Sequence, residues 1–157
     1  MLTAIEVVNR KQKQILFKGL QTYFADDLHK KTIAIWGLAF KANTDDMREA
    51  SSRVLLELLW QAGSKVQAYD PAAMPIAKRI YGERNDFRLC DSAIAALTNA
   101  DALVIVTEWN EFKTPDFNLI KQQLTNPVVF EGRNLFDPKS MAQLGIDYYC
   151  IGRGNAL

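Results

Sequence analysis

Short apolar runs alternate along this chain with longer segments in which apolar residues recur at helical spacing. A short apolar run bounded by polar or turn residues is typical of a buried strand, and recurrence at every third or fourth position is typical of an amphipathic helix. The apolar runs predict strands at residues 32–38, 65–69, 87–89, 103–106, 127–130 and 147–150. The helical spacing predicts helices at residues 51–61, 74–81, 92–98, 116–124 and 138–144.

This alternation of strand and helix predicts the α/β class, with a doubly wound, Rossmann-like parallel sheet. Residues 103–106 are continuously apolar, as expected for a strand that is buried on both faces. Gly63 lies at a C-terminal capping position and ends the helix at 51–61. That helix is predicted to face the core with Val54, Leu55, Leu58 and Leu59. The tail at 152–155 is expected to fray.

Residues 2–24 form a further amphipathic segment ahead of the first strand. A helix of about 20 residues is around 30 Å long, which exceeds what a lead-in to a strand needs. Two interpretations are open: a connecting and dimerising helix, or a helix that packs on its own domain. The apolar positions, at mostly helical spacing, are Leu2, Ile5, Val8, Ile15, Leu16, Leu20, Tyr23 and Phe24.

Composition narrows the class of protein. The 157 residues are 48% hydrophobic and 24% charged, enough for a single compact domain with an appendage. A net charge of +1 argues against a nucleic-acid surface built on strong basicity. We find neither a long apolar span nor the layout of a signal peptide, and Cys90 and Cys150 lack a partner motif. These features predict a cytoplasmic protein with reduced cysteines and no membrane or nucleic-acid partner.

The loop after the first predicted strand carries the most chemical information. An open α/β sheet presents ligand-binding groups at the carboxyl ends of its strands. Dinucleotide-binding loops have three glycines at this point, whereas residues 37–50 contain only Gly37. Lys41 and Arg48 lie in the loop with Asp45, Asp46 and Glu49 beside them. Such a loop would hold an anion by side chains, and a plain NAD-binding Rossmann domain is disfavoured.

Several motifs in the chain closely resemble the UDP-binding domain of the UDP-glucose and GDP-mannose dehydrogenase family. The resemblance covers almost the whole sequence, and Thr44 and Met47 favour the branch of the family that acts on UDP-glucose. The matching segments are residues 37–41 (Gly-Leu-Ala-Phe-Lys), 44–49 (Thr-Asp-Asp-Met-Arg-Glu), 69–71 (Tyr-Asp-Pro), 107–112 (Thr-Glu-Trp-Asn-Glu-Phe) and 132–134 (Gly-Arg-Asn).

The resemblance implies roles for four side chains. It places Phe40, Lys41 and Arg133 against the UDP-sugar, and it directs Arg48 toward NAD that is held mainly by a preceding domain. Purely structural alternatives exist for each. Phe40 could belong to the core and Lys41 to the solvated surface. Arg48 could brace the loop by neutralising neighbouring carboxylates, and Arg133 could form an ion pair with Glu131 or Asp137.

Other polar residues are assigned structural roles. Asp70 follows the second strand at the place of a ribose-binding acid, but Pro71 and the missing glycines favour a turn and helix cap. Asp45 and Asp46 are interpreted as loop-bracing or helix-N-terminal acids rather than general acid–base groups. His29, the single histidine, is expected to be exposed and structural, and neither a catalytic triad nor metal-ligand spacing is present. Glu108 and Trp109 belong to a matching motif without a chemical assignment.

The resemblance implies oxidation of the sugar C6 alcohol to a carboxylate, with two NAD molecules and a cysteine nucleophile. The family's cysteine motif and NAD fingerprint lie in its middle and first domains, and neither Cys90 nor Cys150 has the matching context. We therefore expect residues 1–27 to end a central connecting helix and 28–157 to form a UDP-sugar-binding domain. This piece should be inactive alone, and the whole enzyme, with its amino-terminal and middle domains, should form a homodimer.

Two other interpretations stay open. One is a stand-alone nucleotide-sugar-binding or regulatory domain. The other is the same domain of a related dehydrogenase that acts on UDP-N-acetylmannosamine or GDP-mannose.

Overall fold

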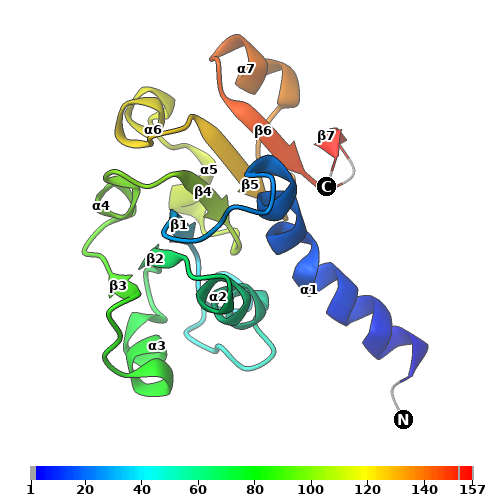
Figure 1. The fold of residues 1–157 in the computed structure, drawn as a ribbon, viewed down its shortest axis with the longest axis vertical. Coiled ribbons are helices and arrows are strands. Elements are labelled where there is room, and N and C mark those ends of the chain that lie inside the picture. The colour runs from blue at the N-terminus through cyan, green and yellow to red at the C-terminus, as the bar shows by residue number, and fades with distance from the viewer. Residues whose placement is uncertain (1–2, 152, 157) are drawn as a thin grey trace.

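The computed structural model of the chain describes residues 3–151 and 153–156, which form a parallel sheet covered by helices on both faces (Figure 1). The strands of the described residues are β1 (Thr32–Trp36), β2 (Lys65–Tyr69), β3 (Phe87–Leu89), β4 (Ala102–Ile105), β5 (Val128–Glu131), β6 (Asp147–Cys150) and β7 (Arg153–Ala156). The helices are α1 (Ala4–Tyr23), α2 (Ser51–Gln61), α3 (Met74–Tyr81), α4 (Ala93–Leu97), α5 (Asn110–Lys113), α6 (Phe117–Gln123) and α7 (Pro138–Gln143).

The strands follow the order β3-β2-β1-β4-β5-β6-β7, and each neighbouring pair is parallel. Strands β1, β4 and β5 occupy the centre, where every residue of β4 and β5 is buried. Their apolar sequences fit this position, because a parallel strand covered on both faces needs apolar side chains on both sides. The predicted α/β, doubly wound, Rossmann-like fold is confirmed.

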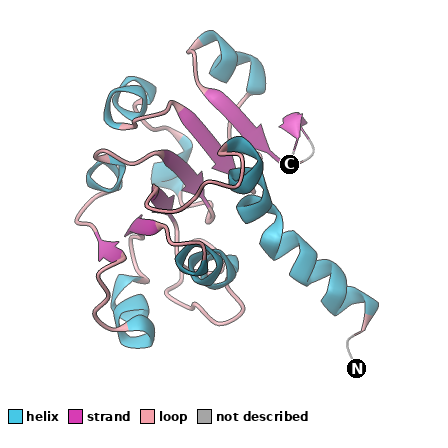
Figure 2. Cartoon of the chain, in the orientation of Figure 1, coloured by secondary structure: helices cyan, strands magenta, loops and turns pink. Residues whose placement is uncertain are grey.

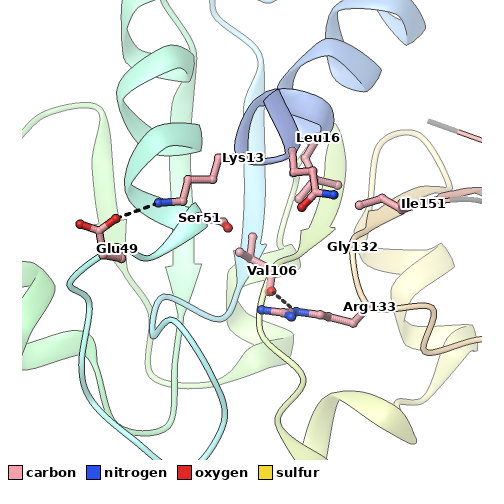
Figure 3. A pocket seen from close by; sticks show the side chains of 9 residues that line it. Lys13, Leu16, Glu49, Ser51, Val106, Gly132, Arg133 and Ile151 are labelled. Atoms are coloured by element: carbon pink, nitrogen blue, oxygen red, sulfur yellow. Dashed lines mark hydrogen bonds and ion pairs between the residues drawn. The ribbon is translucent and has the colours of Figure 1, made fainter. Parts of the chain in front are cut away.

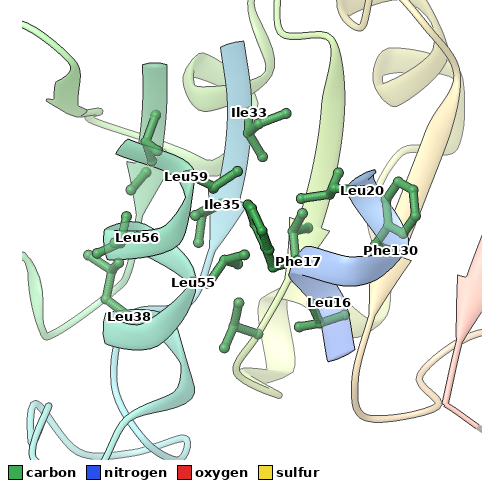
Figure 4. Close-up of a cluster of buried hydrophobic side chains, with 14 of the residues drawn as sticks. Leu16, Phe17, Leu20, Ile33, Ile35, Leu38, Leu55, Leu56, Leu59 and Phe130 are labelled. Atoms are coloured by element: carbon green, nitrogen blue, oxygen red, sulfur yellow. The ribbon is translucent and has the colours of Figure 1, made fainter. Parts of the chain in front are cut away.

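Alternate residues along the strands point to opposite faces of the sheet and pack into two separate cores. Ile33 and Ile35 of β1 pack on one face with α1 and α2, as the close-up in Figure 4 shows, and α3 belongs to the same core. Ala34 and Trp36 point to the other face, where α4, α5, α6 and α7 lie. The helices in Figure 2 accordingly form two layers, with the sheet between them.

Helix α1 is continuous, and its carboxyl-terminal half packs on its own domain. Leu16, Phe17 and Leu20 join the core shared with α2 and β5, and Leu20 is completely buried. The rest of α1 runs outward from the sheet toward the amino terminus (Figure 1). The side chains of Ile5 and Val8, and the whole of Leu2, lie outside the described residues. Their expected place in a seam therefore stays a prediction, whereas Leu16 and Leu20 are core residues.

From Thr32 onward, the predicted strands and helices agree with the observed bounds to within one residue at each end, except at β1. Four features of the chain differ from the prediction. Strand β1 ends at Trp36 rather than at residue 38, because Gly37 turns the chain with a φ of +98°. Helix α2 buries Leu55 and Leu59 as predicted, but it also buries Leu56, while Val54 and Leu58 are half-buried. The short helix α5 was not predicted. The tail, predicted to fray, forms β7 beside β6.

Among the described residues, none of the helices combines the length and the apolar character that a bilayer crossing requires.

Candidate functional site

The candidate residues gather at the carboxyl edge of the sheet, where β1 is flanked by β2 on one side and by β4 on the other. The strand order reverses here, with β2 and β3 on one side of β1 and β4 to β7 on the other, and open α/β sheets bind ligands in the crevice at such a point. The loop at 37–50 follows β1, residues 106–109 follow β4, and residues 132–137 follow β5. These three loops contain every residue predicted to contact a ligand.

Gly37 and Thr107 lock the first two of these loops together. A Cβ atom on Gly37 would lie 2.5 Å from the Thr107 side chain, so only glycine fits at this close approach. The Thr107 hydroxyl donates a hydrogen bond of 2.6 Å to the carbonyl oxygen of Ala39. Gly37 therefore serves loop packing here, and the loop lacks the glycine-rich cradle of NAD domains.

Asp70 holds the start of the loop that follows β1. The side chain is completely buried, and its carboxylate accepts from the main-chain N–H groups of Leu38 and Ala39 at 2.7 and 3.0 Å. It also accepts from the main chain of Ala72 and Ala73, both at 2.8 Å, at the start of α3. The predicted turn at the end of β2 is therefore present, but Asp70 does not cap α3, whose N-cap residue is Ala73. The buried carboxylate is inaccessible to a ribose.

Trp109 completes this arrangement. Its indole Nε1 donates to Asp70 Oδ2 at 3.2 Å, which joins the loop after β4 to the loop after β1. The sequence singled out Trp109 through its motif but gave it no role, because a contact between residues so far apart in sequence leaves no local pattern. The structure places it as a brace.

Arg48 and Asp46 form a two-pronged ion pair farther along the loop. Arg48 Nη2 and Nε lie 2.8 and 3.0 Å from the two Asp46 carboxylate oxygens. The hydrogen bonds from Arg48 lower the pKa of Asp46 to about 2. The Arg48 side chain is nonetheless 87% exposed, so its outer edge can still reach a ligand. The structure thus shows the bracing contact, and the expected contact with NAD stays a prediction.

Phe40, Lys41 and Arg133 are brought together although 93 residues separate the first from the last. Arg133 Nη2 donates to the Phe40 carbonyl oxygen at 3.3 Å, and its Nε donates to that of Val106 at 3.4 Å. Lys41 Nζ lies 5.3 Å from the centre of the Phe40 ring. Phe40 is 37% exposed, one of the two large apolar side chains that reach the surface of the described residues. An aromatic face and two cations therefore share one exposed site.

The Arg133 guanidinium donates to main-chain carbonyl oxygens, so of the two predicted ion pairs the one with Glu131 does not form. The Glu131 carboxylate is completely buried and accepts from the main-chain N–H groups of Arg133 and Leu135 at 2.7 and 2.9 Å. It also accepts a short hydrogen bond from the Tyr148 hydroxyl. Burial raises the pKa of Tyr148, and the contact with Glu131 raises it further.

A pocket of about 450 Å³ opens beside Arg133, between α1 and the carboxyl edge of the sheet (Figure 3). Lys13 of α1 forms an ion pair of 3.3 Å with Glu49 across this region. The pocket is therefore lined both by α1 and by the loops that follow β1 and β5. Its lining consists of Gln12, Lys13, Leu16, Glu49, Ser51, Val106, Gly132, Arg133 and Ile151.

Three further candidates for chemistry, His29, Cys90 and Cys150, are not among the residues that line this pocket. His29 is exposed at the amino edge of the sheet, as predicted. Cys90 and Cys150 are both buried, and burial raises the pKa of the Cys90 thiol. A cysteine nucleophile needs a lowered pKa and access to its substrate, so the environment of Cys90 is that of a core residue.

Comparison with known proteins decides the family. The profile described as "UDP-glucose/GDP-mannose dehydrogenase family, UDP binding domain" matches residues 34–138, which include the loops after β1, β2, β4 and β5. The chain belongs to this family. The resemblance seen in the sequence motifs is therefore confirmed, and the match is to the family's UDP-binding domain.

Curated relatives agree with this membership. The UDP-glucose 6-dehydrogenase of Pseudomonas aeruginosa is 45% identical to this chain and aligns with 99% of it. The UDP-glucose 6-dehydrogenase TuaD of Bacillus subtilis is 37% identical and aligns with 98%. The chain corresponds to 35% and 32% of these two proteins, so it spans about a third of their length.

Solved structures show the same fold. The UDP-glucose dehydrogenase of Pyrobaculum islandicum superposes with a TM-score of 0.68 at 27% identity, over 79% of this chain and 26% of that chain. The NDP-N-acetyl-D-galactosaminuronic acid dehydrogenase of Methanosarcina mazei gives a TM-score of 0.76 at 24% identity. That alignment covers 99% of this chain and 33% of the other, and it shows the likeness of the folds alone.

Proposed function

We propose that this chain is the UDP-sugar-binding domain of an NAD-dependent UDP-glucose 6-dehydrogenase, which oxidises UDP-glucose to UDP-glucuronate. The observation that carries the proposal is the contact of Arg133 with the Phe40 carbonyl, which makes one site of residues from two distant motifs. The names of the relatives, UDP-glucose 6-dehydrogenases in P. aeruginosa and B. subtilis, support the same substrate. In this proposal α1 ends the helix that connects the domain to the rest of the enzyme, with the boundary near residue 27.

The chemistry of the site suits a nucleoside diphosphate. Lys41 and Arg133 are exposed cations, and a guanidinium can engage phosphate oxygens with two parallel hydrogen bonds. The exposed ring of Phe40 offers an apolar face to a base or sugar. Since the loop is held by Asp70 and Thr107, these side chains meet the ligand from a fixed main chain.

Arg48 is the residue of this chain that we propose to contact NAD. Two of its nitrogens already bond to Asp46, which fixes the direction of the side chain. The exposed guanidinium retains donors for a ligand oxygen, so the residue fits a supporting role toward a cofactor held elsewhere. NAD, when bound, accepts the hydride removed from the sugar.

The nucleophile and the principal NAD-binding residues are proposed to lie in the parts of the enzyme that correspond to the rest of the relatives' length. The two cysteines of this chain are buried, and Cys90 has a raised pKa. The domain therefore supplies one wall of the active site, and by itself it is proposed to be inactive. The complete enzyme is proposed to be a homodimer.

Titration of the chain with UDP tests the binding role. Replacing Lys41 by alanine removes one charge-assisted contact, which typically contributes about 1.5–3 kcal/mol, so affinity should fall roughly 10- to 100-fold. The matched control is Lys65→Ala, because Lys65 is an exposed lysine at the opposite end of the strands. Equal affinities of the Lys41 and Lys65 variants for UDP would contradict the proposal.

A further inference from the structure

The buried polar side chains of this domain are concentrated around the proposed site. Among the described residues, four of the five bond to the main chain of its loops: Ser52, Asp70, Thr107 and Glu131. The fifth, Ser64, bonds to the Leu28 carbonyl oxygen at 2.7 Å, near the amino edge of the sheet. Burying a polar group costs free energy unless the group is hydrogen-bonded. The four groups near the site offset this cost with bonds to the loops, so we infer that they hold the loops in place.

Glu131 is the most demanding of these groups because it is a completely buried carboxylate. It follows Phe130 in β5, so alternation directs its side chain toward the core shared with Tyr148 rather than toward α1 and α2. No ion pair of the described residues includes Glu131. An apolar side chain would fill such a place at lower cost, which leaves the main-chain hydrogen bonds as the reason for a carboxylate.

Those bonds fix the turn that carries Arg133. One Glu131 oxygen accepts from Arg133 N at 2.7 Å, and the other accepts from Leu135 N at 2.9 Å. Between them Asn134 has a φ of +57°, a left-handed conformation that needs support from its surroundings. The carboxylate thus clamps both sides of the turn and sets where the Arg133 side chain leaves the main chain.

Tyr148 in turn fixes the carboxylate. Its hydroxyl donates to Glu131, and it accepts from the main-chain N–H of Phe136 at 3.3 Å. The ring lies in the second core, with 3% of the residue exposed, so it cannot shift independently of the sheet. Strand β6 therefore helps to fix the position of Arg133, because its Tyr148 holds the Glu131 carboxylate that bonds to the Arg133 main chain.

We propose that Glu131 is a positioning residue for the UDP-sugar site: it acts on the ligand through Arg133, and Tyr148 holds it in place. This inference rests on the proposed function, since it assumes that Arg133 binds the ligand. A substitution of Glu131 should therefore change the affinity for UDP only while the Arg133 guanidinium is present.

A double-mutant cycle measures this dependence. UDP affinity is determined by NMR titration for the wild type, Glu131→Gln, Arg133→Ala and the double variant. A glutamine keeps one acceptor oxygen and loses the other, so it should weaken UDP binding roughly three- to tenfold. In the Arg133→Ala background the same substitution should leave the affinity unchanged. Ser64→Ala, which also removes a buried hydrogen bond, is the control and should bind UDP like the wild type.

The outcomes distinguish a failure of the positioning role of Glu131 from a failure of the proposed UDP site. If Arg133→Ala binds UDP as tightly as the wild type, the site is wrong and the inference fails with it. If Arg133→Ala binds weakly but Glu131→Gln weakens binding equally in both backgrounds, or in neither, only the positioning role is overturned. Should Glu131→Gln not fold, Tyr148→Phe replaces it in the cycle, with a smaller loss of about twofold expected in the wild-type background alone.

Discussion

Arg48 and Asp46 show how one side chain can brace a loop and remain available to a ligand. The ion pair joins residues two positions apart, yet 87% of the Arg48 side chain is exposed. The contact is a local one that fixes the side chain's direction. Because it lies at the surface, its contribution to the stability of the domain should be small.

Acid should release this brace. The pKa of Asp46 is lowered to about 2, whereas the ordinary value in an unfolded chain is about 3.9. A depressed pKa of this kind stabilises the loop at pH values above the ordinary value, and that support is lost as the pH falls toward 2. An NMR titration of the Asp46 carboxyl carbon should give a midpoint near 2 in the wild type. Arg48→Ala should return the midpoint toward the ordinary value, and a wild-type midpoint near 4 would refute this assignment.

The sequence identifies the individual candidate residues, but it does not predict their contacts. Phe40, Lys41, Arg48 and Arg133 stand in motifs, and the turn role of Asp70 followed from Pro71 and the missing glycines. Glu131 was considered only as an ion-pair partner of Arg133. The contacts of its carboxylate are with Tyr148 and main-chain donors, and Tyr148 becomes a neighbour only when β5 and β6 pair.

At the scale of elements, the hydrophobic pattern predicted most of the sheet and its helices. Helices α2 and α3 and strands β2, β3 and β6 have the bounds that the pattern indicates. It failed where tertiary contacts decide the outcome. Strand β1 stops early at the turn of Gly37, after which the N–H groups of Leu38 and Ala39 bond to Asp70, and β7 forms by pairing with β6.

Helix α1 carries the most consequential difference between pattern and structure. Its apolar stripe suggested a seam with another subunit or domain, but Leu16, Phe17 and Leu20 are used by the core of this domain. Removing the helix at residue 27 would therefore expose that core, and not merely change an association state. Any seam must use the part of α1 nearer the amino terminus.

Leu20→Ala tests whether α1 is an integral part of the domain. Leu20 is completely buried, and deleting a buried leucine side chain costs about 2–5 kcal/mol of unfolding free energy. Urea denaturation should show a loss in this range. The control is Lys18→Ala, an exposed position on the same helix, with an expected change below about 0.5 kcal/mol. A loss equally small for both variants would mean that α1 is not packed on the domain in solution.

At the scale of the whole molecule, the chain spans about a third of its curated relatives. Hydride transfer requires cofactor, alcohol and nucleophile held together in a near-attack arrangement. The chain presents the exposed side chains of Phe40, Lys41 and Arg133 at one edge of its sheet, and its cysteines are buried in the core. We propose that its contribution to such a reaction is to hold the nucleotide part of the substrate.

The isolated chain should consequently produce no NADH from UDP-glucose and NAD, even at high protein concentration. Cys90→Ser and Cys150→Ser should make no difference in this absorbance assay, because neither thiol serves as a nucleophile in our account. A full-length UDP-glucose 6-dehydrogenase assayed in parallel supplies the positive control. Turnover by the chain alone that disappears in either cysteine variant would show that its catalytic groups had been misassigned.

Chemical-shift mapping with UDP tests most directly that the carboxyl edge of the sheet is the nucleotide site. In ¹⁵N-labelled protein, UDP should shift the amide signals of Phe40, Lys41 and Arg133. Signals at the amino edge, such as that of Lys65, should stay in place. The shifts should saturate together, since the three residues belong to one site. Unchanged signals around Phe40 at millimolar UDP, or shifts confined to another surface, would contradict the account.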